Sequence, residues 1–319
     1  MPSSSFDSKA ESDGTWSVTA SGTFDYDALL LDSGSVSAPE SYLLYYDTGY
    51  GSKVNDPLVE IGARPLDQKY YIQQLKNNLA YLGVTAIETV GAEELASRLS
   101  DTAYSGYGLI MISGAIPDTV YDGTSASLLP TWISNGGSFY WAGNTIGKYI
   151  GHSDGSITET AGYDVLFLGA SDCINTQVQE EKRRGGAAYS DVTSNDLRYA
   201  LHLKNNNILY GIETSKLAAG TYLELGFTEN GYSSIVFKQN GSGQVCLMAG
   251  DYSNHQRMDL STVIAAGICW STSVVDWTSG TVSKGTASGQ FDTSLSAGDQ
   301  SIFLMLGGDF AVYGRTYDI

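Results

Sequence analysis

Apolar and polar positions alternate in two different rhythms through the middle of the chain. Short apolar runs predict four strands: Tyr42–Asp47, Thr85–Val90, Gly108–Gly114 and Ser138–Trp141. Between these runs, apolar residues recur every three or four positions, which predicts helices over Asp67–Leu82, Ala92–Leu99 and Leu128–Ser134. Runs that are apolar on both faces are typical of a parallel sheet covered by helices. We therefore expect an α/β fold with a doubly wound, mostly parallel sheet.

The pattern becomes richer in strands after residue 160. Four more strands are predicted over Val165–Leu168, Ile208–Tyr210, Tyr222–Leu225 and Ser234–Phe237. Asn240 and Gly241 mark a hairpin turn that leads into a further strand over Gln244–Gly250. An amphipathic helix over Asp259–Trp270 then closes this part of the chain. Several of these strands are expected to pair antiparallel.

The two ends of the chain carry nearly the same segment. Thr19–Asp25 reads TASGTFD and Thr286–Asp292 reads TASGQFD, so six of the seven positions match. Both lie in runs rich in Ser, Thr and Gly with alternating apolar residues, which favours strands. Gly307–Asp309 predicts a hairpin near the end. We expect residues 1–41 and 275–319 to form one accessory β module beside an α/β domain over 42–274.

Charge limits the partners of this chain. Its 35 acidic and 17 basic residues give a net charge of −18, which repels nucleic acid and anionic membrane surfaces. No apolar run approaches the length that spans a bilayer, and no signal peptide or anchor is visible. The polar positions are mostly Ser, Thr, Asn and Gly, which favours an extracellular or cell-surface location. Self-association or binding to other surface proteins is the expected partnership, with a glycan as a possible ligand.

Few residues offer reactive chemistry. Cys173, Cys246 and Cys269 lack the spacing of a zinc site or redox motif, and buried free thiols are the favoured interpretation. Cys173 follows a predicted strand, so a catalytic thiol there remains an alternative. The three histidines are His152, His202 and His255, and a loop or strand position explains each. No cofactor is expected, although aspartates in turns leave calcium as an alternative.

The turn after the strand Ser138–Trp141 lacks a nucleophile. The segment is predicted to be a strand feeding a sharp turn into a helix, which is the geometry that presents a catalytic cysteine or serine in α/β hydrolytic folds. Here the turn holds Ala142, Gly143 and Asn144. Glycine lets a ligand approach the backbone closely, so we expect a binding site for a neutral ligand. Its predicted residues are Tyr140, Trp141, Gly143, Asn144 and His255.

The order of these motifs resembles the class I glutamine amidotransferase-like domain, a flavodoxin-like α/β fold, over residues 42–271. The similar features are the strand ending at Ser113 and Gly114, the helix before Asn135–Gly137, and the late hairpin before a terminal helix. The family carries a cysteine at the turn after the fourth strand and a histidine after a late strand. The resemblance implies that the cysteine is lost near Ala142 or Gly143, whereas His255 stands in the place of the histidine.

A non-catalytic function is the main expectation from these observations. The vacant turn and the β-rich ends favour an extracellular structural or interaction protein that assembles into a layer or filament. A hydrolase or amidotransferase-like enzyme with an unrecognised Cys or His site is the first alternative. A glycan-binding or calcium-binding module is the second.

Overall fold

The computed structural model describes residues 5–10, 15–32, 39–47, 49–51, 68–176, 210–227, 232–249, 254–265, 269–270, 273–276, 285–296, 300–306 and 310–315. The chain divides into two compact units. One unit contains the described residues up to 37 and from 271 onward, and the other contains the described residues from 38 to 176 and from 210 to 270. The boundaries predicted from the sequence fall after residues 41 and 274.

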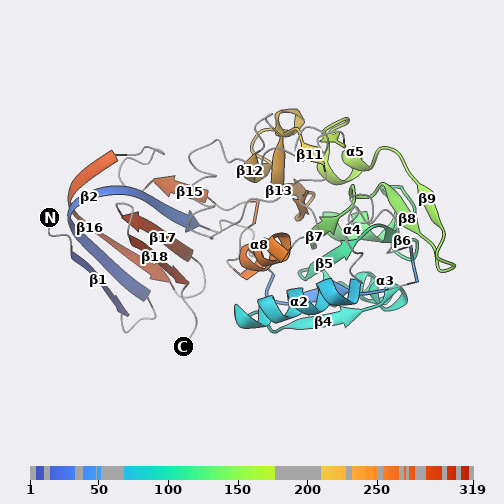
Figure 1. Cartoon of the computed structure of the whole chain (residues 1–319), viewed down its shortest axis with the longest axis horizontal. Helices are drawn as coiled ribbons and strands as arrows, with labels where there is room; N and C mark the ends of the chain where they lie inside the picture. The colour runs from blue at the N-terminus through green and yellow to red at the C-terminus, as the bar shows by residue number, and fades with distance from the viewer. Residues whose placement is uncertain are drawn as a thin grey trace. The chain divides into compact units, whose positions relative to one another are not determined.

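The first unit is an antiparallel sheet of six strands from both ends of the chain (Figure 1). These strands are β1 (Ser5–Ala10), β2 (Thr15–Asp32), β15 (Ser273–Asp276), β16 (Gly285–Ser296), β17 (Gln300–Leu306) and β18 (Phe310–Arg315). The long strand β2 pairs with β1, β15, β16 and β17. The predicted hairpin at Gly307–Asp309 joins β17 to β18, although its tip lies outside the described residues.

The second unit contains a mixed sheet. Its main order is β10 (Ile174–Asn175), β11 (Gly211–Ile212), β13 (Ser233–Asn240), β14 (Gly243–Met248), β7 (Ser138–Gly143), β5 (Gly108–Ser113), β3 (Tyr42–Tyr45) and β4 (Ile87–Val90), with β12 (Tyr222–Phe227) also paired to β13. The pairs from β14 to β4 are parallel. The pairs among β10–β14 are antiparallel.

This sheet corrects the predicted fold class, because the doubly wound, mostly parallel flavodoxin-like sheet is not what forms. The antiparallel pairs are as numerous as the parallel ones. The reason is local: a tight turn after Asn240 joins β13 to β14, and a short connection reverses the chain, whereas a parallel pair needs a long crossover. The prediction gave too much weight to the first four strands.

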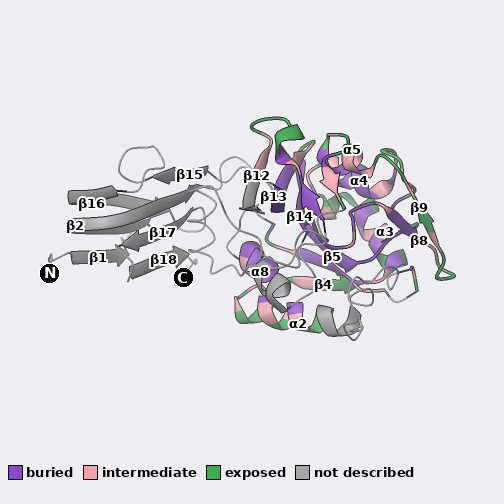
Figure 2. Cartoon of the chain, turned by 45° about the horizontal axis from the view of Figure 1, so that its top comes forward, coloured by how far each residue is buried: buried purple, intermediate pink, exposed green. Residues whose placement is uncertain are grey.

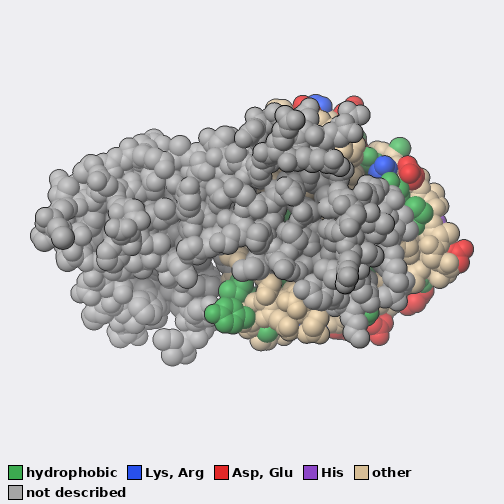
Figure 3. Space-filling model, in the orientation of Figure 1, with side chains coloured by type: hydrophobic (Ala, Val, Ile, Leu, Met, Phe, Trp, Pro, Cys, Tyr) green, Lys and Arg blue, Asp and Glu red, His purple; other side chains and the backbone are tan. Residues whose placement is uncertain are grey.

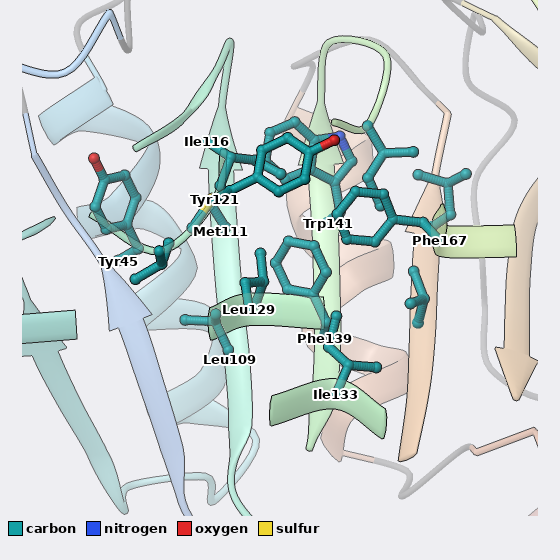
Figure 4. Packing of buried hydrophobic residues seen from close by; sticks show 14 of the residues in the cluster. Tyr45, Leu109, Met111, Ile116, Tyr121, Leu129, Ile133, Phe139, Trp141 and Phe167 are labelled. Carbon is teal, nitrogen blue, oxygen red and sulfur yellow. The ribbon is translucent and has the colours of Figure 1, made fainter. Parts of the chain in front are cut away.

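Helices pack on both faces of the mixed sheet. One face contacts α3 (Ala92–Ser100), α4 (Leu128–Ser134) and α5 (Tyr163–Leu168), whose apolar residues share one buried cluster with the sheet. Figure 4 shows its aromatic centre, with Phe139, Trp141 and Phe167 close together. The helices α2 (Gln68–Tyr81) and α8 (Asn254–Ala265) contact each other, and α2 also contacts β5. Short 3-10 turns lie at Thr102–Tyr104 and Thr214–Lys216.

The helix boundaries follow local chemistry. The helix α2 buries Ile72, Leu75 and Leu79 at helical spacing, and Gly83 follows it with a φ of 88°. At the start of α3, the Asp47 carboxylate accepts a hydrogen bond from the Ala92 N–H at 3.0 Å. This contact joins the end of β3 to a helix N-terminus, where negative charge is favourable.

Three sequence predictions were wrong in this unit. Val165–Leu168 lies in the helix α5 rather than in a strand, since a four-residue apolar run does not by itself distinguish the two. The helix α8 begins at Asn254, five residues before the predicted start. The turn after β7 leads into the strand β8 (Tyr149–Gly151) rather than into a helix.

A second, small sheet is formed by segments that follow β5 and β7 in the sequence. It contains β6 (Ile116–Pro117), β8 and β9 (Ile157–Glu159). Figure 2 shows that the strands of the mixed sheet are mostly buried, whereas the hairpin of β8 and β9 reaches exposed surface. Among the helices in the described ranges, none is long and apolar enough to cross a membrane.

Candidate functional site

The turn after β7 is closed by its own polar groups. Trp141 is fully buried, and its indole N–H donates to the carbonyl oxygen of Asn144 at 2.7 Å. The Asn144 side-chain oxygen accepts from the Thr145 N–H at 2.8 Å. Tyr140 is buried against Tyr42 and Phe237, and burial raises the pKa of its phenol. Gly143 is buried at the end of β7, so the predicted aromatic side chains belong to the core.

The remaining sequence candidates lie elsewhere. His255 is in the first turn of α8, and its side chain lies outside the described residues, as does all of His202. Cys173 is a free, fully buried thiol whose Sγ donates to the Ala170 carbonyl at 3.3 Å. Burial and the nearby Asp164 charge raise its pKa to about 11, which keeps it protonated and unreactive at neutral pH. Cys246 and Cys269 are also free and buried.

His152 links two side chains in the small sheet. Its Nδ1 lies 2.7 Å from Asp118 Oδ2, and its Nε2 lies 2.8 Å from Thr158 Oγ1. An ionised carboxylate only accepts hydrogen bonds, so in the neutral ring Nδ1 carries the proton and Nε2 accepts from the Thr158 hydroxyl. We call these three residues the triad. Hydroxyl, imidazole and carboxylate stand in the order used by Ser-His-Asp hydrolases, where the imidazole takes the hydroxyl proton.

Three strands position the triad. Asp118 follows β6, and its N–H donates to the Gly151 carbonyl of β8 at 2.9 Å. His152 follows β8, where its N–H donates to the Ser156 carbonyl at 2.9 Å and so closes the hairpin. Thr158 on β9 is paired with Ile150, two residues before His152, which brings the hydroxyl to the Nε2 edge of the imidazole. About one-third of the His152 side chain is exposed, so solvent reaches the triad.

A second hydrogen-bonded pair lies near Asp118. Tyr50 donates its hydroxyl to Glu93 Oε1 at 2.8 Å, and this bond raises the pKa of Tyr50 to about 12, with the Asp118 and Asp47 charges adding to the rise. The Tyr50 backbone also presses on β8, because a Cβ at Gly151 would sit 1.7 Å from its carbonyl oxygen. Asp and Glu side chains mark the margin of the described surface that Figure 3 shows. This acidic setting favours neutral or cationic ligands.

Sequence reasoning placed His152 in a loop and missed the triad. Asp118 is 34 residues from His152, and no local motif connects them. The only usable signal was the short hairpin that brings His152 and Thr158 within six residues of each other. Within the described ranges, no group of three or more His, Cys, Asp or Glu residues is arranged to hold a metal ion.

Comparison with known proteins gives structural matches only. No protein-family model and no curated protein matches the chain. An exo-beta-1,4-mannosidase from Opitutaceae bacterium strain TAV5 is 14% identical with a TM-score of 0.41, and covers 78% of this chain and 37% of its own. Beta-galactosidases from Bacillus circulans sp. alkalophilus and Rahnella sp. R3 are each 12% identical with TM-scores of 0.41, and cover 85% of this chain and 42% and 41% of theirs. This chain therefore spans about two-fifths of their length.

These findings correct the expected function. The matched structures are glycoside hydrolases, which contradicts the expectation of a non-catalytic structural protein. The expectation rested on the missing nucleophile at the turn after β7, and a vacant turn at one position does not exclude reactive groups elsewhere in the fold. At this identity and TM-score the matches transfer no residue and no substrate to this chain. The resemblance to amidotransferase-like domains, the extracellular location and the surface partners stay predictions.

Proposed function

We propose that the protein is a hydrolase that cleaves esters at the triad. The observation that carries this proposal is the continuous hydrogen-bonded chain from Thr158 Oγ1 through His152 to Asp118, with distances of 2.8 and 2.7 Å. A hydroxyl that already donates to an imidazole is placed for activation as a nucleophile. The carboxylate holds the ring in the tautomer that can accept the proton.

Each residue has one role in the proposed reaction. Thr158 Oγ1 attacks the ester carbonyl carbon while its proton passes to His152 Nε2. The carbon–oxygen bond to the leaving alcohol breaks, and the alcohol takes the proton from Nε2, which leaves an acyl-threonine. Water then attacks this acyl group and gives a proton to Nε2, and Thr158 regains that proton as the acid departs. Asp118 stabilises the imidazolium formed in both steps.

The backbone hydrogen bonds of the β8–β9 hairpin predict slow ester hydrolysis. The N–H groups of His152 and Gly155 donate to carbonyls within the turn, and that of Ser156 donates to Asp154. These three donors are occupied, so they do not stabilise the oxyanion that forms during acyl transfer. Removal of one such donor costs known hydrolases about 10²–10³-fold in rate. Thr158 is also a secondary alcohol, and its methyl group crowds the attack.

The test uses p-nitrophenyl acetate as a small neutral ester. Thr158→Ala should lower the steady-state rate by at least about 100-fold, the usual scale for loss of a nucleophile or its base. Thr131→Ala, which changes an exposed threonine on α4, is the matched control and should keep the wild-type rate. Thr158→Ser should keep or raise the rate. Mass spectrometry after acid quenching should find the acetyl group on the peptide that contains Thr158.

Three outcomes would reject this mechanism. A Thr158→Ala variant with the wild-type rate excludes the acyl-threonine route. If ester hydrolysis slows in Cys173→Ala and keeps its wild-type rate in Thr158→Ala, the nucleophile is the buried thiol of Cys173. A loss in His152→Phe alone, with Thr158→Ala active, would instead assign His152 as a general base that activates water directly.

A further inference from the structure

The repeated segments at the two ends of the chain pair with each other. In the antiparallel register of β2 and β16, Gly22 of the first copy stands opposite Gly289 of the second. Thr19 stands opposite Asp292, and Asp25 stands opposite Thr286. The pairing is therefore centred on the middle residue of both copies, and the two segments are related by a local two-fold axis at the glycine pair.

This symmetry makes each segment complementary to itself. An antiparallel partner for TASGTFD, centred on its glycine, is another TASGTFD. In such a pair Thr19 would again face an aspartate, Ala20 would again face a phenylalanine, and Gly22 would face Gly22. Within these seven residues, only the position of Gln290, which is threonine in the first copy, distinguishes this arrangement from the pairing within one chain.

Charge supports the same register. The centred antiparallel pairing places each aspartate opposite a threonine, so no like charges face each other. A parallel in-register pairing of two β2 strands would place Asp25 opposite Asp25, and like charges directly opposite destabilise a sheet. The segment thus favours one orientation and one register with a copy of itself.

We propose that two copies of this chain associate by exchanging these segments, with β2 of one copy paired to β2 of the other about Gly22. The β16 strands that this exchange releases pair with each other in the same antiparallel way, centred on Gly289. The partner is a second copy of this chain, and the interface is isologous, as a two-fold contact requires. Within the seven-residue segments the exchanged pairs match those within one chain at every position but those of Gln290 and its counterpart Thr23, so association costs little pairing energy there and rises with protein concentration.

Single cysteines in the full-length chain test this arrangement. Residues directly opposite in an antiparallel pair have Cα atoms about 4.5–5.5 Å apart, within the range of a disulfide. Gly22→Cys should therefore form a disulfide-linked dimer under mild oxidation, and Gly289→Cys should do the same. Ser17→Cys is the control, since two Ser17 residues would lie ten positions apart, roughly 33 Å. The native thiols in the described core are buried, which limits background reaction.

The outcomes separate exchange from a closed single chain. Dimers on a non-reducing gel for Gly22→Cys and Gly289→Cys, with Ser17→Cys monomeric, support the proposal. Monomers for both glycine variants, together with an internal disulfide in the Gly22→Cys/Gly289→Cys double variant, overturn it. Equal crosslinking of Ser17→Cys also overturns it, because the contact would have another register. Light scattering of the unmodified chain needs no variant, and a constant monomer mass up to the highest concentration rejects exchange.

Discussion

The turn after β7 and the hairpin of β8 and β9 follow each other in the chain but use their polar atoms in opposite ways. In the turn, the Trp141 indole and the Asn144 amide bond to backbone atoms within four residues, and the aromatic ring is fully buried. In the hairpin, His152 bonds to two other side chains and stays about one-third exposed. A glycine-rich turn at a sheet edge is therefore not in itself a site. Accessible side chains that are linked to one another are the stronger indication.

The largest expected effect is on the hairpin side of this comparison. Asp118→Asn should lower ester turnover by roughly 10²–10⁴-fold, because an amide can donate to Nδ1 and hold the proton on Nε2, where it blocks acceptance from Thr158. Asp101→Asn is the matched control, since Asp101 caps a 3-10 turn and stands outside the triad. Steady-state rates with p-nitrophenyl acetate measure both. Equal rates for Asp118→Asn and wild type would remove the carboxylate from the mechanism.

The turn side should respond in stability instead. Trp141→Ala should lower the free energy of unfolding by about 3–5 kcal/mol, as expected when a fully buried aromatic side chain leaves a cavity. Tyr81→Ala is the control, because Tyr81 is 90% exposed and should change stability by less than about 0.5 kcal/mol. Urea denaturation followed by circular dichroism measures both variants. A Trp141→Ala cost as small as that of Tyr81→Ala would show that the turn is not part of the core.

A smaller effect is expected where Tyr50 meets the hairpin. Gly151→Ala should cost roughly 1–3 kcal/mol through overpacking, since the new Cβ would collide with the Tyr50 carbonyl oxygen. It should also reduce ester turnover, because Asp118 bonds to the Gly151 carbonyl. Gly106→Ala introduces a Cβ with no heavy atom within 4 Å, so it serves as the control. Thermal melting measures both variants. Equal melting midpoints for Gly151→Ala and Gly106→Ala would contradict the contact with Tyr50.

The smallest effect concerns the pH dependence of the buried thiol. The pKa of Cys173 is raised from 9.0 to about 11, so folding favours the protonated thiol. Its contribution to stability is fully present below pH 9 and is lost as pH rises through 11. The stability difference between wild type and Cys173→Ala should therefore shrink over this interval. Chemical denaturation at pH 8 and pH 10.5 measures it, and a constant difference would show that the thiol is not shielded.

The sequence predicted the parts of the fold whose signals are local. The helix α2 was expected over 67–82 and is found over 68–81, because its buried leucines recur at helical spacing and Gly83 stops it. The strand β5 was expected over 108–114 and is found over 108–113. A continuous apolar run is long enough here to be unambiguous. Near residue 165 the run is too short, and the helix α5 was mistaken for a strand.

Sheet order and the candidate site needed the tertiary structure. The strands β12, β13 and β14 pair antiparallel with one another, and β14 then pairs parallel to β7. No local pattern in these strands predicts which strand each will pair with. Asp118 follows β6, His152 follows β8 and Thr158 lies on β9, and their hydrogen bonds exist only because β6 and β9 flank β8. Taken one at a time, the three residues of the triad look in the sequence like ordinary loop or edge-strand residues.

The amino-acid sequence by itself determined the charge, the helical spacing of α2, the apolar strands and the repeat shared by the two ends. These are properties of neighbouring positions, which backbone geometry and local burial convert directly into structure. The tertiary structure alone decided that the repeats stand opposite each other about Gly22 and Gly289, and that the hydroxyl and imidazole of the β8–β9 hairpin meet the Asp118 carboxylate that follows β6. Contacts of this kind depend on strand register between distant segments, and register is set by the packing of the whole sheet.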